Sequence, residues 1–128
     1  MLNEKEFNRV KEEVKLAYAD CNGNKSYDET CNERNLKYFC ETAVTPAEAE
    51  KIMKSALSDF VSDGYAYNEF RAKHLNNFPK EAKIHLARES SVCIYVEDNI
   101  NIFMKSADEF HKNETKGNFD HLARYWWD

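Results

Sequence analysis

Residues 92–96 read Val92-Cys93-Ile94-Tyr95-Val96, and the fold class depends on whether this run is a strand or part of a helix. Its β-branched and aromatic composition is typical of a strand. The longer segment 91–112, however, spaces its apolar residues as one face of a helix would. The residues in that pattern are Val92, Val96, Ile100, Phe103, Ala107 and Phe110. We therefore predict a helix over 91–112, with a short strand near 92–96 as the alternative.

The segments on either side of this run show the same helical spacing. Pro79 stands at a favourable first position for a short helix over 79–87, which would carry Leu86 on its apolar face. Polar residues dominate 113–118 and predict a loop. After that loop, apolar residues recur at three- and four-residue steps over 119–126. This spacing predicts a short terminal helix.

Two helix starts are signalled by capping residues. Asn3 followed by Glu6 forms a capping-box pattern, and the apolar steps beyond it predict a helix over 4–21. Thr45 followed by Pro46 and Glu48 repeats the pattern and predicts a helix that ends near Gly64. Between the two, a less regular helix is predicted over the segment that carries Cys31, Leu36, Phe39 and Cys40.

These segments together predict an all-α fold. We expect a single domain over 1–128, built as a compact bundle of about six short-to-medium helices. A chain of 128 residues falls within the size range of one domain, and its apolar content of 42% is sufficient for a real core. No long polar linker divides it.

The formal charge of −5 is spread evenly along the chain. A nucleic-acid-binding protein usually concentrates lysine and arginine on one face, so we expect no direct contact with nucleic acid. No apolar run is long enough to span a membrane, and no signal peptide is visible, so we expect a cytoplasmic protein. The acidic excess favours encounter with a basic surface on another protein.

Four cysteines leave two redox states open. In the cytoplasm Cys21, Cys31, Cys40 and Cys93 would be buried thiols, which is the interpretation we favour. The alternative is a secreted protein whose leader is missing. Such a protein would be a carrier with two disulfides and an apolar cavity.

Catalytic and metal-binding patterns are weak. Asp108 and His111 are three residues apart and would share a helical face, so they are weak candidate metal ligands for a small helical enzyme. A third ligand would come from another histidine: His74, His85 or His121. A nucleophilic role for Cys40 or Cys93 has no supporting motif. With three glycines and no phosphate-binding loop, the chain predicts no cofactor.

The C-terminal aromatic run is the best candidate for a binding surface. Adjacent indoles on a helix point about 100° apart, so Trp126 and Trp127 cannot both face one core. Tryptophan, tyrosine and arginine are also the residues that anchor protein interfaces. The candidate binding residues are Arg124, Tyr125, Trp126 and Trp127, with Tyr65 and Tyr67 after Gly64.

The sequence thus favours a non-catalytic protein over an enzyme. We expect a small acidic module that docks on a larger protein and modulates or inhibits it. Phage counter-defence proteins and bacterial immunity proteins are similar in size and charge, which is an analogy of composition only. Homodimerisation through an aromatic or helical face fits the same features. The metal-dependent enzyme and the secreted carrier stay as alternatives.

Overall fold

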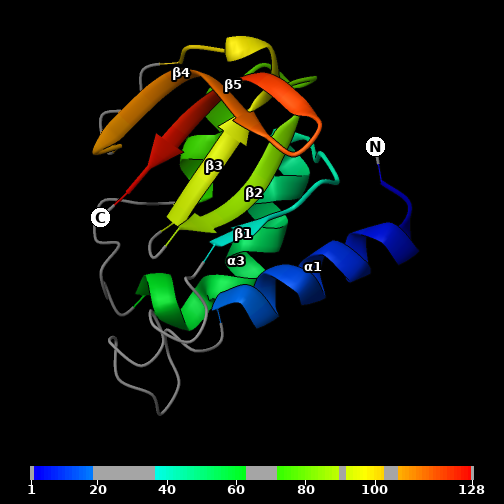
Figure 1. Ribbon diagram of the computed structural model, residues 1–128. Coiled ribbons are helices and arrows are strands. Elements are labelled where there is room, and N and C mark those ends of the chain that lie inside the picture. The colour runs from blue at the N-terminus through cyan, green and yellow to red at the C-terminus, as the bar shows by residue number, and fades with distance from the viewer. Residues whose placement is uncertain (1, 19–36, 63–71, 90–91, 103–106, 128) are drawn as a thin grey trace.

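The computed structural model describes residues 2–18, 37–62, 72–89, 92–102 and 107–127 (Figure 1). The helices α1 (Glu4–Tyr18) and α3 (Pro46–Ser62) and the 3-10 turn η2 (Ala72–Asn77) pack on one face of an antiparallel sheet. Within the described residues the sheet has five strands in the spatial order β1-β2-β3-β5-β4. They are β1 (Lys37–Phe39), β2 (Ile84–Glu89), β3 (Val92–Val96), β4 (Glu109–Lys116) and β5 (Phe119–Trp126). The predicted all-α bundle is therefore wrong.

The run at 92–96 is the strand β3, not the start of a helix. It lies between β2 and β5, and all five of its residues are buried. Ile94 packs into the core under the helices, whereas Cys93 and Tyr95 belong to a second cluster. Because both faces of this strand are covered, it lacks the polar alternation that identifies a half-buried strand. A short run of apolar residues fits a helical template as well as an extended one, which explains the error.

The other predicted elements around this strand are corrected in the same way. The helix over 79–87 is replaced by β2, and the terminal helix over 119–126 by β5. The segment that carries Phe39 enters the sheet as β1. The predicted loop over 113–118 lies mostly in β4, and its turn is confined to Gly117 and Asn118. After β3, the helix predicted over 91–112 gives way to the 3-10 turn η3 (Glu97–Asn99) and to β4.

The predicted start of α1 is confirmed. The Glu6 amide donates to Asn3 Oδ1 at 2.8 Å, and Asn3 Nδ2 donates back to Glu6 Oε1 at 2.8 Å. The first is the N-cap bond of a capping box, whereas the return bond comes from the side-chain amide of Asn3 and not from its backbone N–H. The helix then buries Val10 and Val14 against the sheet. The last residues of the predicted helix, 19–21, lie outside the described part of the chain.

The predicted start of α3 is also confirmed. Thr45 Oγ1 accepts from the Glu48 amide at 3.3 Å, and Glu48 Oε1 accepts from the Thr45 amide at 2.9 Å. Glu48 also receives the Leu2 amide at 2.7 Å, so one carboxylate fixes the starts of both α1 and α3. Burial disfavours the charged form, but these bonds outweigh it and lower the pKa of Glu48. No described helix is long and apolar enough to cross a membrane.

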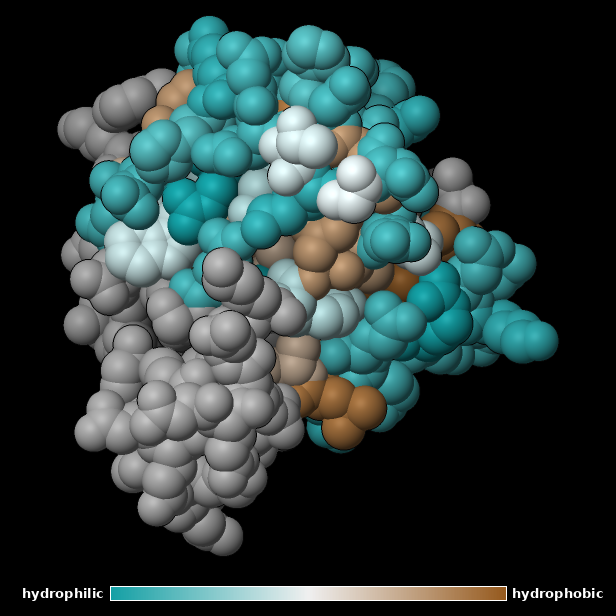
Figure 2. All heavy atoms as spheres, in the orientation of Figure 1, coloured by the Kyte–Doolittle hydropathy of each residue, from teal (hydrophilic) through white to brown (hydrophobic). Residues whose placement is uncertain are grey.

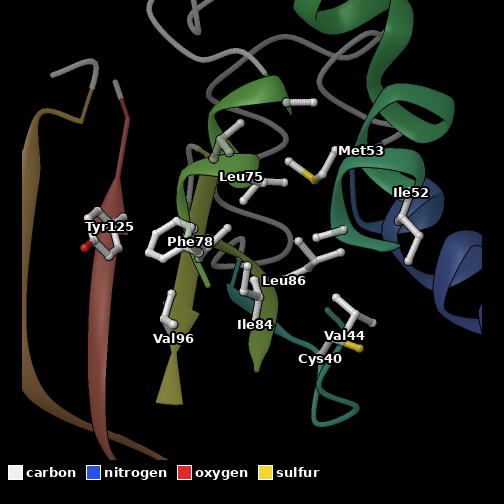
Figure 3. Packing of buried hydrophobic residues seen from close by; sticks show 14 of the residues in the cluster. Cys40, Val44, Ile52, Met53, Leu75, Phe78, Ile84, Leu86, Val96 and Tyr125 are labelled. Atoms are coloured by element: carbon white, nitrogen blue, oxygen red, sulfur yellow. The ribbon is translucent and has the colours of Figure 1, made fainter. Parts of the chain in front are cut away.

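The main core lies between the helices and the sheet (Figure 3). Met53 of α3 and Leu75 of η2 extend towards each other, and Phe78 places its ring edge-on to Tyr125 at 5.5 Å. Ile84 and Leu86 of β2 fill the centre of this layer. This core covers one face of the sheet, and among the described residues the other face is lined by side chains of the strands alone.

The sheet is strongly curved because the β4–β5 hairpin folds back towards β1 (Figure 1). Phe119 lies at the hairpin tip. The centroid of its ring is 4.5 Å from that of His85 and 5.9 Å from that of Phe39. Asn113 in β4 and His121 in β5 have positive φ angles, and the β4–β5 register shifts beside Asn113. Such irregularities bend a strand and increase its twist. The curvature encloses a second, smaller cluster on the face away from the helices.

Candidate functional site

The C-terminal aromatic run lies in and after β5, and the sheet divides it between its two faces. Trp127 is fully buried in the main core, and its amide donates to Val92 O at 3.0 Å. Tyr125 is buried in the same layer and donates its hydroxyl to Ile102 O at 2.7 Å. Trp126 is half-buried on the opposite face. In a strand adjacent side chains point to opposite faces, so each indole has its own cluster.

The other predicted binding residues are placed differently. Arg124 is largely buried on the curved face and does not project into solvent, with 15% of its side chain exposed. Tyr65 and Tyr67 lie outside the described residues. A binding role for the six residues stays a prediction. Because Trp127 is part of the core, its substitution would test folding before it tested binding.

The candidate metal ligands do not share a face. Asp108 precedes β4 and His111 lies within it, so the helical spacing on which their pairing rested does not occur. His111 is half exposed and stands 4.0 Å from the Glu109 carboxylate. His121 is exposed, and His85 is completely buried. Among the described residues, no three His, Cys, Asp or Glu side chains are grouped closely enough to hold a metal ion.

Glu89 is the centre of a polar network on the curved face. Its Oε1 accepts from Lys116 Nζ and from the Tyr95 hydroxyl, both at 2.8 Å, and its Oε2 accepts from Arg124 Nε at 2.9 Å. Burial disfavours the charged carboxylate, but these three donors outweigh it and lower the pKa of Glu89 to about 2. The network therefore joins β2, β3, β4 and β5 with a carboxylate that is charged at neutral pH.

The two described cysteines have raised pKa values, whereas a nucleophilic cysteine has a lowered one. Cys93 lies beside this network, and burial raises its pKa to about 12. Cys40 lies in the main core, where burial again raises its pKa above the ordinary value. A catalytic thiol needs a lowered pKa. Both thiols are free, while Cys21 and Cys31 lie outside the described residues.

A buried histidine and a half-buried glutamate form a second polar unit. His85 Nδ1 lies 2.9 Å from the carbonyl oxygen of Cys40, and Nε2 lies 2.6 Å from Glu97 Oε2. The imidazole stacks on the ring of Phe39, with 5.0 Å between the ring centroids, and it also contacts the ring of Phe119 in β5. The ring cannot move without disrupting both contacts. It therefore holds the Glu97 carboxylate in a fixed orientation.

Glu97 also lines an open groove at the end of the sheet where β2 begins. The groove has a volume of about 570 Å³. Its lining comes from five separate segments of the chain, four of which contribute apolar residues, and charged residues stand among them. The lining residues are Leu2, Ala43, Val44, Thr45, Glu48, Lys80, Glu81, Ala82, Lys83, Glu97 and Phe119.

Sequence reasoning missed this groove and the pair at its edge. His85 and Glu97 are twelve residues apart, a separation that no helical pattern brings together. The antiparallel register places Ile84 opposite Val96 and His85 opposite Tyr95, so His85 and Glu97 are diagonal neighbours across the two strands. The available signal was the β-branched and aromatic composition at 92–96. Had this run been assigned to a strand paired with residues 84–89, the contact between His85 and Glu97 would have been predicted.

The chain was compared with protein-family models, curated proteins and solved structures, and it matches none of them.

Proposed function

We propose that the protein is a non-catalytic binding module, which docks on a larger protein and modulates or inhibits it. The observation that carries this proposal is a contrast within the described residues. The reactive side chains on the curved face are already engaged inside the fold. The Glu89 carboxylate accepts hydrogen bonds from three side chains, and burial keeps Cys93 protonated as a thiol. The groove beside Glu97, in contrast, is open and partly apolar. Open apolar surface with a few polar groups is typical of recognition.

The surface composition agrees with a partner that is met in solution. The face drawn in Figure 2 is mainly hydrophilic, with a limited apolar area among polar atoms. The net charge of −5 favours a basic partner surface. We also propose a cytoplasmic location, which the free and buried thiols of Cys40 and Cys93 support.

The test is affinity capture combined with a mass measurement. Tagged protein, incubated with lysate of the organism that encodes it, is expected to retain one partner at stoichiometric amount, which mass spectrometry then identifies. The purified chain alone is expected to elute at its monomer mass of 15.0 kDa in light scattering. A dimer mass without any captured protein would replace docking by self-association. Capture of nothing, from a monomeric chain, would contradict the proposal.

A further inference from the structure

The contacts of His85 determine which oxygen of the Glu97 carboxylate is engaged inside the fold. Its two ring nitrogens face a carbonyl oxygen of Cys40 and a carboxylate oxygen of Glu97, and both of these groups are acceptors. The contact with Nε2 engages only Oε2 of the Glu97 carboxylate.

The other carboxylate oxygen of Glu97 is available. In the described part of the chain, Glu97 Oε1 has no hydrogen-bond partner. The side chain is 23% exposed and lines the groove. Because the stacked His85 ring fixes the carboxylate, Oε1 is a preorganised acceptor and needs little ordering when a ligand binds.

The walls and the charges of the groove define what that acceptor would take. Apolar side chains line the approach, which suits a flexible hydrocarbon stem. Lys80 and Lys83 stand on the rim with Glu81 between them, and all three are exposed to water, where charges are screened. Glu97 is less exposed than these rim residues, so water screens a hydrogen bond from a cation to Oε1 less than it screens contacts with the rim charges.

We propose that the groove is a subsite for a lysine or arginine side chain of the partner, with its stem against the apolar walls and its charged head on Glu97 Oε1. This inference rests on the proposed docking function. It gives the acidic protein a defined contact for the basic surface that its charge favours.

Small alkyl probes of one length test the subsite without the partner. In amide NMR titrations of the whole chain, n-butylamine is expected to bind with a dissociation constant on the order of 10 mM and to shift the amides of Val44, Ala82 and Glu97. Butanol keeps the stem and lacks the charge, and butyrate reverses the charge. Both are expected to bind at least about fivefold more weakly. Equal binding of the three probes, or shifts elsewhere, would overturn the assignment.

Two glutamine variants then assign the acceptor. Glu97→Gln is expected to weaken butylamine binding about tenfold, whereas Glu81→Gln removes an equal charge from the rim and is expected to change it less than about twofold. Equal losses would mean that the general field, and not Oε1, attracts the amine. The probe series on the unchanged protein remains decisive if Glu97→Gln fails to fold.

Capture of the partner separates this inference from the proposed function. Ala43→Arg places a cationic side chain in the groove, and Thr115→Arg makes the same charge change on the exposed surface of β4. We expect Ala43→Arg to lose the partner and Thr115→Arg to retain it. Retention by both variants would leave the docking function intact and overturn the subsite. Butylamine binding to a chain that captures no partner would instead contradict the docking function.

Discussion

Glu89 is the residue that holds the curved face of the sheet together. It lies at the end of β2 and binds side chains from three other strands, one of them on the far edge. Its side chain is 16% exposed and that of Arg124 15%, so water screens their ion pair little. Such a pair contributes mainly through the penalty that follows when one partner is removed.

We predict that Glu89→Gln lowers the free energy of unfolding by about 2–4 kcal/mol at pH 7, because Arg124 and Lys116 keep their charges and lose the carboxylate. Urea denaturation measures this change. The control is Lys54→Gln, which breaks a pair with Glu50 in which the lysine is 64% exposed. That variant is expected to change stability by less than about 0.5 kcal/mol. Similar losses in both variants would mean that Glu89 contributes no more than a surface charge.

The pH dependence of the same pair follows from the lowered pKa. The pKa of Glu89 falls from 4.5 to about 2 on folding, so its contribution is complete above pH 4.5 and is lost as the pH falls towards 2. The stability difference between the unchanged protein and Glu89→Gln should therefore shrink by about 3 kcal/mol between pH 5 and pH 2. A difference that stays constant over this interval would contradict the pKa assignment.

At the scale of elements, the sequence predicted what local chemistry determines. The starts of α1 and α3 are set by capping residues within three positions of each other, and both predictions are confirmed. The strands could not be predicted in this way. β2 and β3 are buried on both faces, so their residues alternate between two clusters instead of between core and water. Their identity depends on pairing between segments, which apolar spacing does not report.

The candidate site could not be predicted for the same reason. His85 meets Glu97 only because β2 and β3 form a hairpin, and the groove needs five separate segments to assemble. Trp126 and Trp127 show the partial success of the sequence. Their adjacency correctly indicated that they face different surroundings. The angle between them, however, follows from a strand and not from a helix.

The end of β5 yields a direct comparison of the two indoles. We predict that Trp127→Ala lowers the free energy of unfolding by about 3–5 kcal/mol, because the side chain is fully buried under the helices. Trp126→Ala, on the half-buried face, should cost about 1–2 kcal/mol. Thermal and urea unfolding of the two variants check the order. A larger loss in Trp126→Ala would contradict the assignment of faces in the strand.

At the scale of the whole molecule, the helix layer and the curved face share the central strands. Ile84 and Leu86 support the helices, while His85 between them contacts the hairpin tip through Phe119. Loss of either layer would expose one face of β2 and β3. This shared use of the same strands favours a single cooperative unit.

We therefore predict that the chain unfolds in one transition, as expected for the single domain inferred over 1–128. The helical far-UV circular dichroism signal and the fluorescence of Trp126 and Trp127 should give coincident urea curves, because α1 and α3 cannot melt without exposing the core around Trp127. Phe119→Ala removes the contact of the hairpin tip with His85. It should lower the free energy of unfolding obtained from both curves by about 2 kcal/mol. In the unchanged protein, loss of the helical signal at lower urea than the fluorescence change would identify the helix layer as a separate unit. In Phe119→Ala, a shift confined to the fluorescence curve would show that the two faces of the sheet are not coupled.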